Sequence, residues 1–452
     1  MNILPERIKG RYLAKSALIV AATAMLASCG IIGGDDGPKT TPTVGKRIPV
    51  LSRVESGAEV DPSLAGTNVI YPAPVANSGW TQPGGNAAKA MGHVSLGANL
   101  SQAWSASVAG STKRVRLAAA PVAEAGRVYL IDTSAVVHAY DAGNGGKVWS
   151  TGLRVEGDGQ ESVFGGGVSI DGARVFATNG VGEVAALNST DGSIIWKVKP
   201  AGPLRGAPTL AFNSVLVMTQ DNQLYSLNAA DGSVQWNKAG SLGQAGVFGV
   251  AAPAAGQGTI LAGYSSGELN AYRYENGRDV WGDALSRTSI STSVATLSDI
   301  DADPIINQGR VYALGQGGRM AAYELITGQR IWELNIAGIS TPAISGEWIF
   351  TLTDDGRMLC IARSTGKVRW IAKLPKFRNE EKKKDPILWT GPVLAGGRLI
   401  VASTQGGVVS ISTGEGSIST LFNLGESVSL PPMVADNTLY ILDDSGRLTA
   451  FR

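Results

Sequence analysis

Apolar and polar residues alternate in short runs along most of the chain, from about residue 98 to the C-terminus. Runs such as "RVYLI", "RVFAT", "SVLVM" and "TILAG" are separated by polar turns that contain Asp-Gly, Asn-Gly or Thr-Gly. A period of two over four to six residues is typical of β-strands that bury one face. Glycine accepts the positive φ that a tight hairpin requires. The pattern therefore predicts an all-β protein built from hairpins.

A tryptophan ends each repeat of this pattern, at intervals of about 38 to 51 residues. This interval is typical of one blade of a β-propeller, in which four strands form a small sheet. A large aromatic ring at a fixed place in each blade is expected to pack that blade against the next one. The repeats end at Trp149, Trp196, Trp236, Trp281, Trp332 and Trp370, and a degenerate copy without tryptophan reaches Thr420.

The two ends of the repeat region complement each other. The C-terminal stretch "PPMVADNTLYILDDSGRLTAFR" contains three strands without a closing tryptophan strand, whereas "LSQAWSASV" carries Trp104 with no blade before it. Pairing the two segments completes one more blade and removes the free edges of an open ring. The prediction is an eight-bladed β-propeller over residues 98–452, with four antiparallel strands per blade, closed by its N- and C-terminal segments.

The first 97 residues have a different composition. Residues 1–28 combine a basic start with an apolar run of about 11 residues, as in a signal peptide. The run ends in "LASCG", a lipobox pattern that predicts a lipidated Cys29 as the first residue of the mature protein. Gly30 after the cysteine favours the outer membrane. Residues 29–97, rich in Gly, Pro, Thr and Ala, are expected to form the lipidated cysteine and a flexible tether.

Composition and motifs offer little for catalysis. The net charge of +2 and the exported location disfavour nucleic-acid binding. His93 and His138 lie outside metal-binding spacings, and Cys360 is expected to be a small buried hydrophobe. The sequence contains no P-loop, nucleophile elbow or dinucleotide fingerprint. We therefore expect a protein that is not an enzyme and has no metal or cofactor.

Two long connections between blades are candidate contact regions. The first contains "LSDID", in which Asp299 and Asp301 follow Leu297. An EF-hand is excluded because Pro304 and Arg310 occupy positions that require Gly and Glu. We expect an exposed acidic tip that attracts a basic partner surface, with a merely solvated loop as the alternative. The second connection, residues 373–386, is rich in lysine and is either a solvated loop or a partner contact.

The lipobox, the tether, the tryptophan-ended repeats and "LSDID" in this loop together resemble the BamB family of lipoproteins from the outer-membrane β-barrel assembly (BAM) machinery. The resemblance covers residues 98 to 452. It implies a non-enzymatic scaffold that binds a periplasmic POTRA domain of BamA, meets the other BAM lipoproteins indirectly, and has unfolded outer membrane proteins as candidate substrates. The tether and the basic insert around Lys382 are similar to the alphaproteobacterial branch of the family.

The resemblance also implies contact residues. The two acids of "LSDID" take the place of the acids that help to bind BamA, and "GQAGVFGVAAP" takes the place of the other contact loop. In that loop the arginine of the family pattern is absent, although apolar residues remain. The implied BamA contacts are Asp299, Asp301, Leu297, Val247, Phe248 and Ala245.

Two other classes remain open from the sequence. Quinoprotein dehydrogenases that use pyrroloquinoline quinone and calcium share the repeats, but they commonly carry an adjacent Cys-Cys pair that this chain lacks. They also require a cofactor pocket in the propeller channel. The second alternative is a generic periplasmic ligand-binding propeller, although no aromatic-lined motif supports it.

Overall fold

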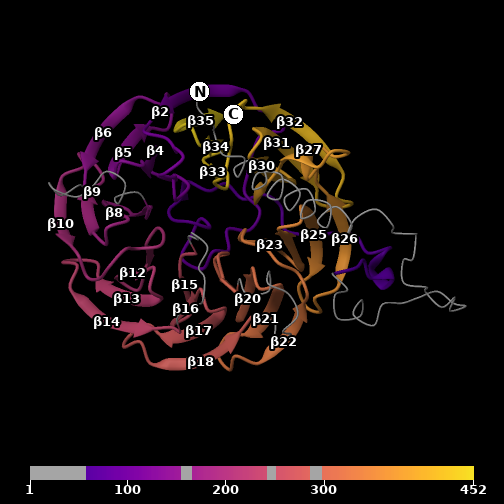
Figure 1. Ribbon diagram of the computed structural model, residues 1–452, viewed down its shortest axis with the longest axis horizontal. Helices are drawn as coiled ribbons and strands as arrows, with labels where there is room; N and C mark the ends of the chain where they lie inside the picture. The colour runs from indigo at the N-terminus through magenta and orange to yellow at the C-terminus, as the bar shows by residue number, and fades with distance from the viewer. Residues whose placement is uncertain (1–57, 154–164, 242–250, 286–297) are drawn as a thin grey trace, which may run out of the picture. The chain divides into compact units, whose positions relative to one another are not determined.

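Eight antiparallel sheets, seven with four strands and one with a fifth inner strand, surround a central channel and form an eight-bladed β-propeller (Figure 1). The computed structural model describes residues 58–153, 165–241, 251–285 and 298–452. Within these ranges the regular elements are strands and one short 3-10 helix, η2 (Pro62–Leu64). No helix in the described part of the chain is long and apolar enough to cross a membrane. The predicted fold class is confirmed.

The strands occupy four concentric positions. The innermost are β3 (Val122–Glu124), β7 (Val168–Asp171), β11 (Thr209–Ala211), β15 (Ala254–Gly256), β19 (Ile305–Asn307), β23 (Ala343–Ser345), β29 (Trp389–Ala395) and β33 (Met433–Ala435). The second strands are β4 (Arg127–Ile131), β8 (Arg174–Thr178), β12 (Ser214–Met218), β16 (Thr259–Gly263), β20 (Arg310–Gly315), β24 (Trp348–Leu352), β30 (Arg398–Ser403) and β34 (Thr438–Leu442). The third are β5 (Val136–Asp141), β9 (Val184–Asn188), β13 (Gln223–Asn228), β17 (Glu268–Arg273), β21 (Arg319–Glu324), β25 (Arg357–Ala362), β31 (Gly407–Ser412) and β35 (Arg447–Phe451). The outermost are β6 (Lys147–Gly152), β10 (Ile194–Val198), β14 (Val234–Ala239), β18 (Asp279–Ala284), β22 (Arg330–Leu334), β26 (Val368–Lys373), β32 (Ile418–Asn423) and β2 (Gln102–Ser107).

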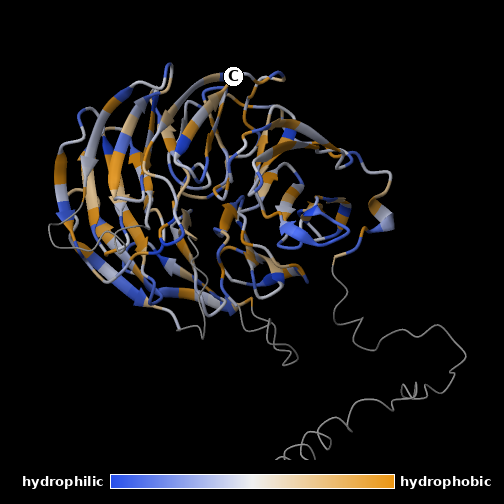
Figure 2. Ribbon diagram, turned by 45° about the horizontal axis from the view of Figure 1, so that its top comes forward, coloured by the Kyte–Doolittle hydropathy of each residue, from blue (hydrophilic) through white to orange (hydrophobic). Residues whose placement is uncertain are grey.

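Burial follows these positions. The second strands are almost wholly buried, as in β12 and β16, because the blades on both sides cover them. The outermost strands alternate between exposed and part-buried residues, as in β14, so that hydrophilic and hydrophobic positions alternate along them (Figure 2). The core is thus a stack of apolar layers between neighbouring blades, as the period-two pattern predicts.

The ring closes between the two ends of the repeat region. Strand β2 pairs with β35, from Gln102 opposite Phe451 to Ser107 opposite Arg447. Ser101 and Arg452 exchange two further backbone hydrogen bonds, of 2.7 and 2.9 Å. The last blade therefore combines three C-terminal strands with one N-terminal strand, as predicted.

Each of the seven tryptophans in the outermost strands packs on a glycine of the next blade. In blade 3, for example, the Trp236 ring lies over Gly277, and its Nε1 donates to the Tyr274 carbonyl at 3.0 Å. A Cβ at position 277 would lie 2.7 Å from the ring, so glycine supplies both the positive φ of the turn and the space for the indole. The seven pairs are Trp104–Gly145, Trp149–Gly192, Trp196–Gly232, Trp236–Gly277, Trp281–Gly328, Trp332–Gly366 and Trp370–Gly416.

The closing junction lacks this lock for a physical reason. Its receiving turn would join β35 to β2, but these two strands come from opposite ends of the repeat region and no turn connects them. Thr420 in β32 accordingly replaces the tryptophan, and Phe422 stacks on Phe451 with ring centroids 4.3 Å apart. The degenerate seventh repeat therefore marks the junction at which the ring closes.

Residues 58–97, here called the N-terminal segment, pack against the propeller. The segment starts on blade 6, where the Val368 carbonyl accepts from the Asp61 amide at 2.8 Å. It then adds β1 (Gly79–Trp80) inside β3 and crosses the channel along the inner strands (Figure 1). The carbonyls of Thr81, Ala87 and Ala88 accept from Ile170 of β7, Ala255 of β15 and Ile306 of β19, and Val94 bonds to β29.

The predicted boundary of the tether is therefore wrong over its second half. Trp80, Val94 and Leu96 are buried, and so are the polar residues Lys89 and His93. Small residues such as Ala87 and Ala88 allow the backbone to approach the inner strands closely. The small residues that are typical of a flexible linker here allow the segment to pack inside the channel.

Candidate functional site

The carboxylates of "LSDID" lie in the connection between β18 and β19, which is described from residue 298. Asp299 is 0% exposed, and Asp301 and Asp303 are 7% exposed. The predicted exposed acidic tip is therefore wrong for these side chains. Three adjacent buried carboxylates require compensating charges and hydrogen bonds, which come from distant parts of the chain.

Arg205 supplies the main compensation for Asp299 and Asp301. It lies in the connection between β10 and β11, two blades earlier, and its side chain is 5% exposed. Its Nη2 donates to both oxygens of Asp299, at 2.9 and 2.8 Å, and to Oδ1 of Asp301 at 3.3 Å. One guanidinium thus joins two inter-blade connections that lie 94 positions apart in the sequence.

The charge balance of this cluster is incomplete. Two carboxylates share one guanidinium, and both Oδ2 of Asp301 and Nη1 of Arg205 lack a hydrogen-bond partner. Burial, reinforced by the neighbouring charge of Asp299, raises the pKa of Asp301 to about 7. We call Arg205, Asp299 and Asp301 the arginine–aspartate cluster.

The third carboxylate interacts with the N-terminal segment. Asp303 Oδ1 accepts from the Ala252 amide at 2.7 Å, which ties it to the preceding inter-blade connection. Lys89 is buried and donates to Thr209 Oγ1 at 3.2 Å and to the Pro83 carbonyl at 2.9 Å. Burial lowers the pKa of Lys89 to about 8, and the charge of Asp303 opposes that shift. The N-terminal segment thus carries a cation into the region of the carboxylates.

Arg205 is not among the residues predicted for the site, although the repeats contain a signal for it. A proline enters the innermost strand of most blades, including Pro208 and Pro304. Arg205 and Asp301 both stand three residues before their proline, so they occupy equivalent positions in two blades. Residues at equivalent positions of two blades lie on the same face of the propeller, so a basic side chain from one blade can pair there with an acidic side chain from the other.

The remaining predicted site residues fall into two groups. Cys29, Ala245, Val247, Phe248 and Leu297 lie outside the described residues. The seven predicted blade tryptophans all make the inter-blade contact described above.

The residues considered for other chemistry have structural partners. His93 Nε2 accepts from the Gly397 amide at 2.8 Å, and His138 Nε2 lies 2.9 Å from Asp132 Oδ2. Cys360 is fully buried, and burial raises the pKa of its thiol. In the described part of the chain, no group of three or more His, Cys, Asp or Glu side chains could hold a metal ion.

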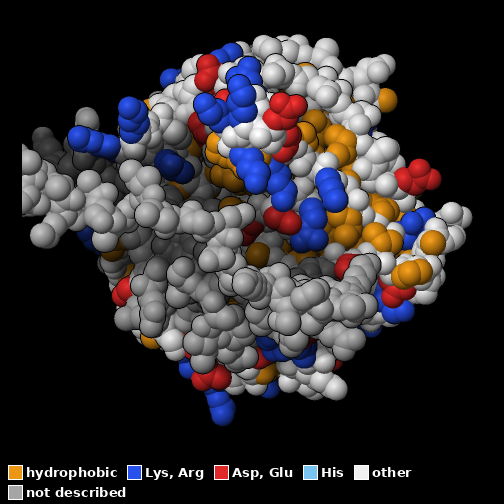
Figure 3. Space-filling view, turned by 45° about the vertical axis from the view of Figure 1, so that its right-hand side comes forward, with side chains coloured by type: hydrophobic (Ala, Val, Ile, Leu, Met, Phe, Trp, Pro, Cys, Tyr) orange, Lys and Arg blue, Asp and Glu red, His pale blue; other side chains and the backbone are white. Residues whose placement is uncertain are grey.

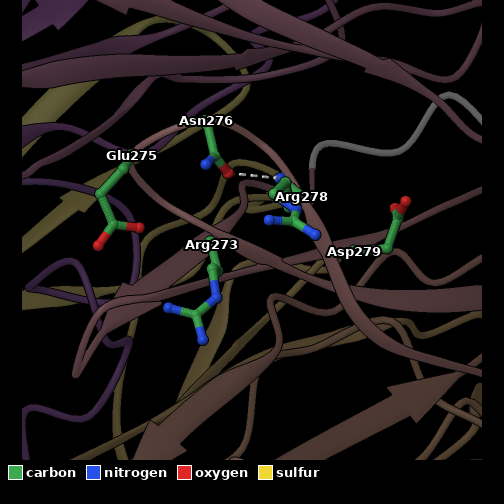
Figure 4. A pocket seen from close by; sticks show the side chains of 5 residues that line it. All are labelled: Arg273, Glu275, Asn276, Arg278 and Asp279. Carbon is green, nitrogen blue, oxygen red and sulfur yellow. Dashed lines mark hydrogen bonds between the residues drawn. The ribbon is translucent and has the colours of Figure 1, made fainter.

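Two cavities of the described residues are shallow or small. One of about 420 Å³ is formed by a single hairpin turn between β17 and β18 (Figure 4). Its charged side chains diverge, and the Arg278 amide donates to Asn276 within the same turn. The other, of about 230 Å³, lies between the N-terminal segment and blades 5 and 6, beside His93 and Arg363. Ligand pockets usually enclose about 300 Å³ or more among several elements, so neither fits a bulky cofactor.

Eight blades, joined by seven tryptophan–glycine contacts and one phenylalanine stack, form a closed β-propeller whose channel is crossed by its own N-terminal segment. A family model described as "Outer membrane protein assembly factor BamB" matches residues 133–372. The protein of that name from Salmonella typhimurium is 30% identical over 352 residues, which cover 77% of this chain and 87% of that protein. The chain belongs to the BamB family, so the resemblance inferred from the sequence is confirmed.

Solved structures agree on the fold. The crystal structure of BamB from Moraxella catarrhalis superimposes with a TM-score of 0.66 at 23% identity, covering 78% of this chain and 99% of that chain. A europium-containing methanol dehydrogenase gives a TM-score of 0.65 at 14% identity, covering 83% and 98%. At these identities the likeness concerns the fold alone.

Proposed function

We propose that this protein is a non-enzymatic scaffold lipoprotein of the BAM complex, which binds the POTRA region of BamA and aids the folding and insertion of outer membrane proteins. Family membership gives the coarse role, in outer membrane protein assembly. The arginine–aspartate cluster supports the finer proposal because it fixes two inter-blade connections on one face. A fixed set of loops loses little conformational entropy when it binds a partner.

In this proposal the two acids act mainly by positioning. Asp299 already binds Arg205, so the carboxylates hold the part of the connection that begins directly after Leu297 in the sequence. The unpartnered Oδ2 of Asp301 is an acceptor that a basic group of BamA can reach when the complex forms. Val247, Phe248 and Ala245 precede Ala252, whose amide binds Asp303, and they supply the apolar part of the contact.

Co-purification of BamA with the tagged lipoprotein tests this contact. Leu297→Arg and Phe248→Arg should each reduce the amount of recovered BamA without changing the melting temperature. Ile326→Arg is the matched control, because Ile326 is 74% exposed in a turn on the opposite face. Equal recovery with all three variants would contradict the proposed contact face.

The occupied channel supports a non-enzymatic role. The N-terminal segment bonds to the inner strands where a quinone cofactor would enter, and the cavity beside it is small. Mixing the purified protein with pyrroloquinoline quinone and calcium, followed by gel filtration, should leave no visible absorption on the protein peak. A stoichiometric quinone spectrum and dye reduction with an alcohol would favour the quinoprotein alternative.

We also propose that Cys29 carries the lipid that anchors the protein to the periplasmic side of the outer membrane. The lipobox supports this, and contacts with the other BAM lipoproteins would then be indirect through BamA. Labelling of the protein with radioactive palmitate should be lost in Cys29→Ala. Label retained by that variant would contradict the anchor site.

The blade edges are the candidate site for unfolded outer membrane proteins. The parallel bridge between Val60 and Val368 supports this, because the chain's own N-terminal segment occupies one edge in an extended conformation. Other edges expose β-branched residues, such as Ile195 at 51% and Val234 at 50%. A peptide from a barrel strand should cross-link to these edges, and Ile195→Pro should reduce the yield at blade 2.

A further inference from the structure

The inserted segment between blades 6 and 7 is a built hairpin rather than a loose loop. Strand β27 (Phe377–Asn379) pairs with β28 (Lys384–Pro386). Glu380 Oε1 accepts from the amides of Lys376 and Phe377, at 2.7 and 3.2 Å, and Asn379 Oδ1 accepts from Lys382 at 2.9 Å. These bonds order the backbone of the hairpin, while its charged side chains are exposed. We call residues 373–388 the basic hairpin.

The basic hairpin concentrates positive charge. Six basic and three acidic side chains give it a net charge of +3, which exceeds the +2 of the whole chain. One of the acids, Glu380, already caps backbone amides, so its charge is partly engaged within the hairpin. The six basic side chains are all exposed: Lys373, Lys376, Arg378, Lys382, Lys383 and Lys384.

Apolar surface lies next to this charge. Leu388 is 62% exposed, and the half-buried Trp389 donates from Nε1 to the Pro375 carbonyl at 2.8 Å. With this side of the molecule turned forward, Lys and Arg side chains gather beside exposed hydrophobic ones (Figure 3). Lysines around an exposed leucine and a tryptophan are typical of a surface that meets lipid headgroups.

The position of the hairpin relative to the predicted anchor is the second observation. Strand β26 leads directly into the hairpin, and the same strand binds the start of the N-terminal segment through Val60 and Asp61. Asp61 also pairs with Lys367 at 3.0 Å. Only 28 residues separate Cys29 from Ala58, a length that spans at most about 100 Å when extended. The chain from the anchor therefore joins the propeller on the blade that carries the hairpin.

We propose that the basic hairpin binds the surface of an anionic phospholipid bilayer and so provides a second membrane attachment beside the lipid on Cys29. This inference rests on the proposed anchor for its location in the cell, but the hairpin's own chemistry does not depend on that lipid. Lipid chains and polybasic segments commonly act together, because each attachment alone is weak. Two attachments on one blade would hold the propeller in a defined orientation, rather than leave it free to rotate about one tether.

Vesicle co-sedimentation tests the proposal without the anchor. The full mature chain, residues 29–452 with Cys29→Ser, should bind vesicles of phosphatidylcholine mixed with phosphatidylglycerol and should not bind phosphatidylcholine alone. Substituting Lys382, Lys383 and Lys384 with Glu should weaken the binding about tenfold or more. Added salt should weaken the binding of the unsubstituted chain, because mobile ions screen exposed charges.

A matched charge change elsewhere provides the control. Lys113, Arg114 and Arg116 form another exposed basic group, in the connection between β2 and β3. Replacing these three with Glu should reduce vesicle binding much less, and both triple variants should keep the far-ultraviolet spectrum and melting temperature of the parent. Equal losses of vesicle binding in the two variants would show that net charge alone explains the effect, and this result would overturn the proposal. The proposal would also fail if the parent chain did not bind the anionic vesicles, or bound neutral vesicles equally well. If the hairpin variant instead keeps its vesicle binding but no longer recovers an acidic envelope protein, the hairpin serves a protein partner and the lipid proposal fails. If the hairpin variant loses vesicle binding but still recovers BamA, the membrane contact is independent of the proposed BamA contact.

Discussion

Replacing Arg205 with Met should destabilise the propeller strongly, because it leaves two buried carboxylates without a cation. The side chains of Asp299 and Asp301 are 0% and 4% exposed, so water cannot replace the lost guanidinium. Removing one partner of a buried ion pair typically costs about 3–5 kcal/mol. The propeller together with its N-terminal segment, about 400 residues, has an unfolding entropy of about 0.8 kcal/mol per kelvin. The melting temperature should therefore fall by roughly 4–6 °C.

Thermal and urea unfolding, followed by circular dichroism, measure this effect. Lys238→Met is the matched control, because Lys238 pairs with Asp279 at 3.1 Å on the surface, where the side chains are 29% and 74% exposed. That change should cost less than about 1 kcal/mol. The triple variant Arg205→Met, Asp299→Asn and Asp301→Asn should recover much of the loss, because no unpaired charge remains buried. Equal stability of the two Met variants, or a triple variant no more stable than Arg205→Met alone, would refute the reasoning.

Three further predictions concern the same packing. The folded state raises the pKa of Asp301 to about 7 from a usual 3.8, so folding binds a proton between these pH values and the free energy of unfolding should fall as the pH rises from about 4 to 7. Urea titrations should show that the stability of Asp301→Asn increases relative to that of the parent over this window; a constant difference in stability would count against the prediction. Gly277→Ala should destabilise more than Gly309→Ala by about 1–3 kcal/mol, because both have a positive φ but only the first would press a Cβ onto Trp236; equal melting temperatures would contradict the lock. Lys89→Glu should lower the melting temperature by more than Lys89→Met, because it adds an anion whose charge acts on buried Asp303; the reverse order would argue against that interaction.

The propeller could be predicted because its information is local and repeated. Each hairpin turn, each alternating strand and each tryptophan is visible within one repeat, and eight copies reinforce one another. Closure of the ring could also be predicted, because the C-terminal end of the repeat region supplies three strands and the N-terminal end supplies one, which together make one complete blade. The Trp–Gly contact, by contrast, links a residue of one blade to a turn of the next, so the pairing itself needed the structure.

The N-terminal segment could not be predicted from composition alone. Few large apolar residues and many small ones usually indicate a chain that buries too little area to become ordered. The channel changes this balance, because its inner strands offer unpaired backbone groups at many blades. Ala87 and Ala88 bind through their carbonyls, which composition does not register.

The burial of Asp299 and Asp301 was missed because their partner is distant in the sequence. A polar loop between blades is usually exposed, and nothing within "LSDID" shows a cation. Arg205 lies 94 positions before Asp299, and only the register of the repeats relates the two loops. The partner-binding role of these acids, the lipid anchor and the alphaproteobacterial origin stay predictions.

Site-specific photocross-linking in living cells tests the central claim most directly, namely that this propeller holds BamA through the face with the inter-blade connections. A photoreactive amino acid at position 297 should give a covalent adduct with BamA, whereas the same group at position 326, exposed on the opposite face, should not. An adduct with BamA from position 326 alone, or none from either position in cells that assemble outer membrane proteins normally, would contradict the account.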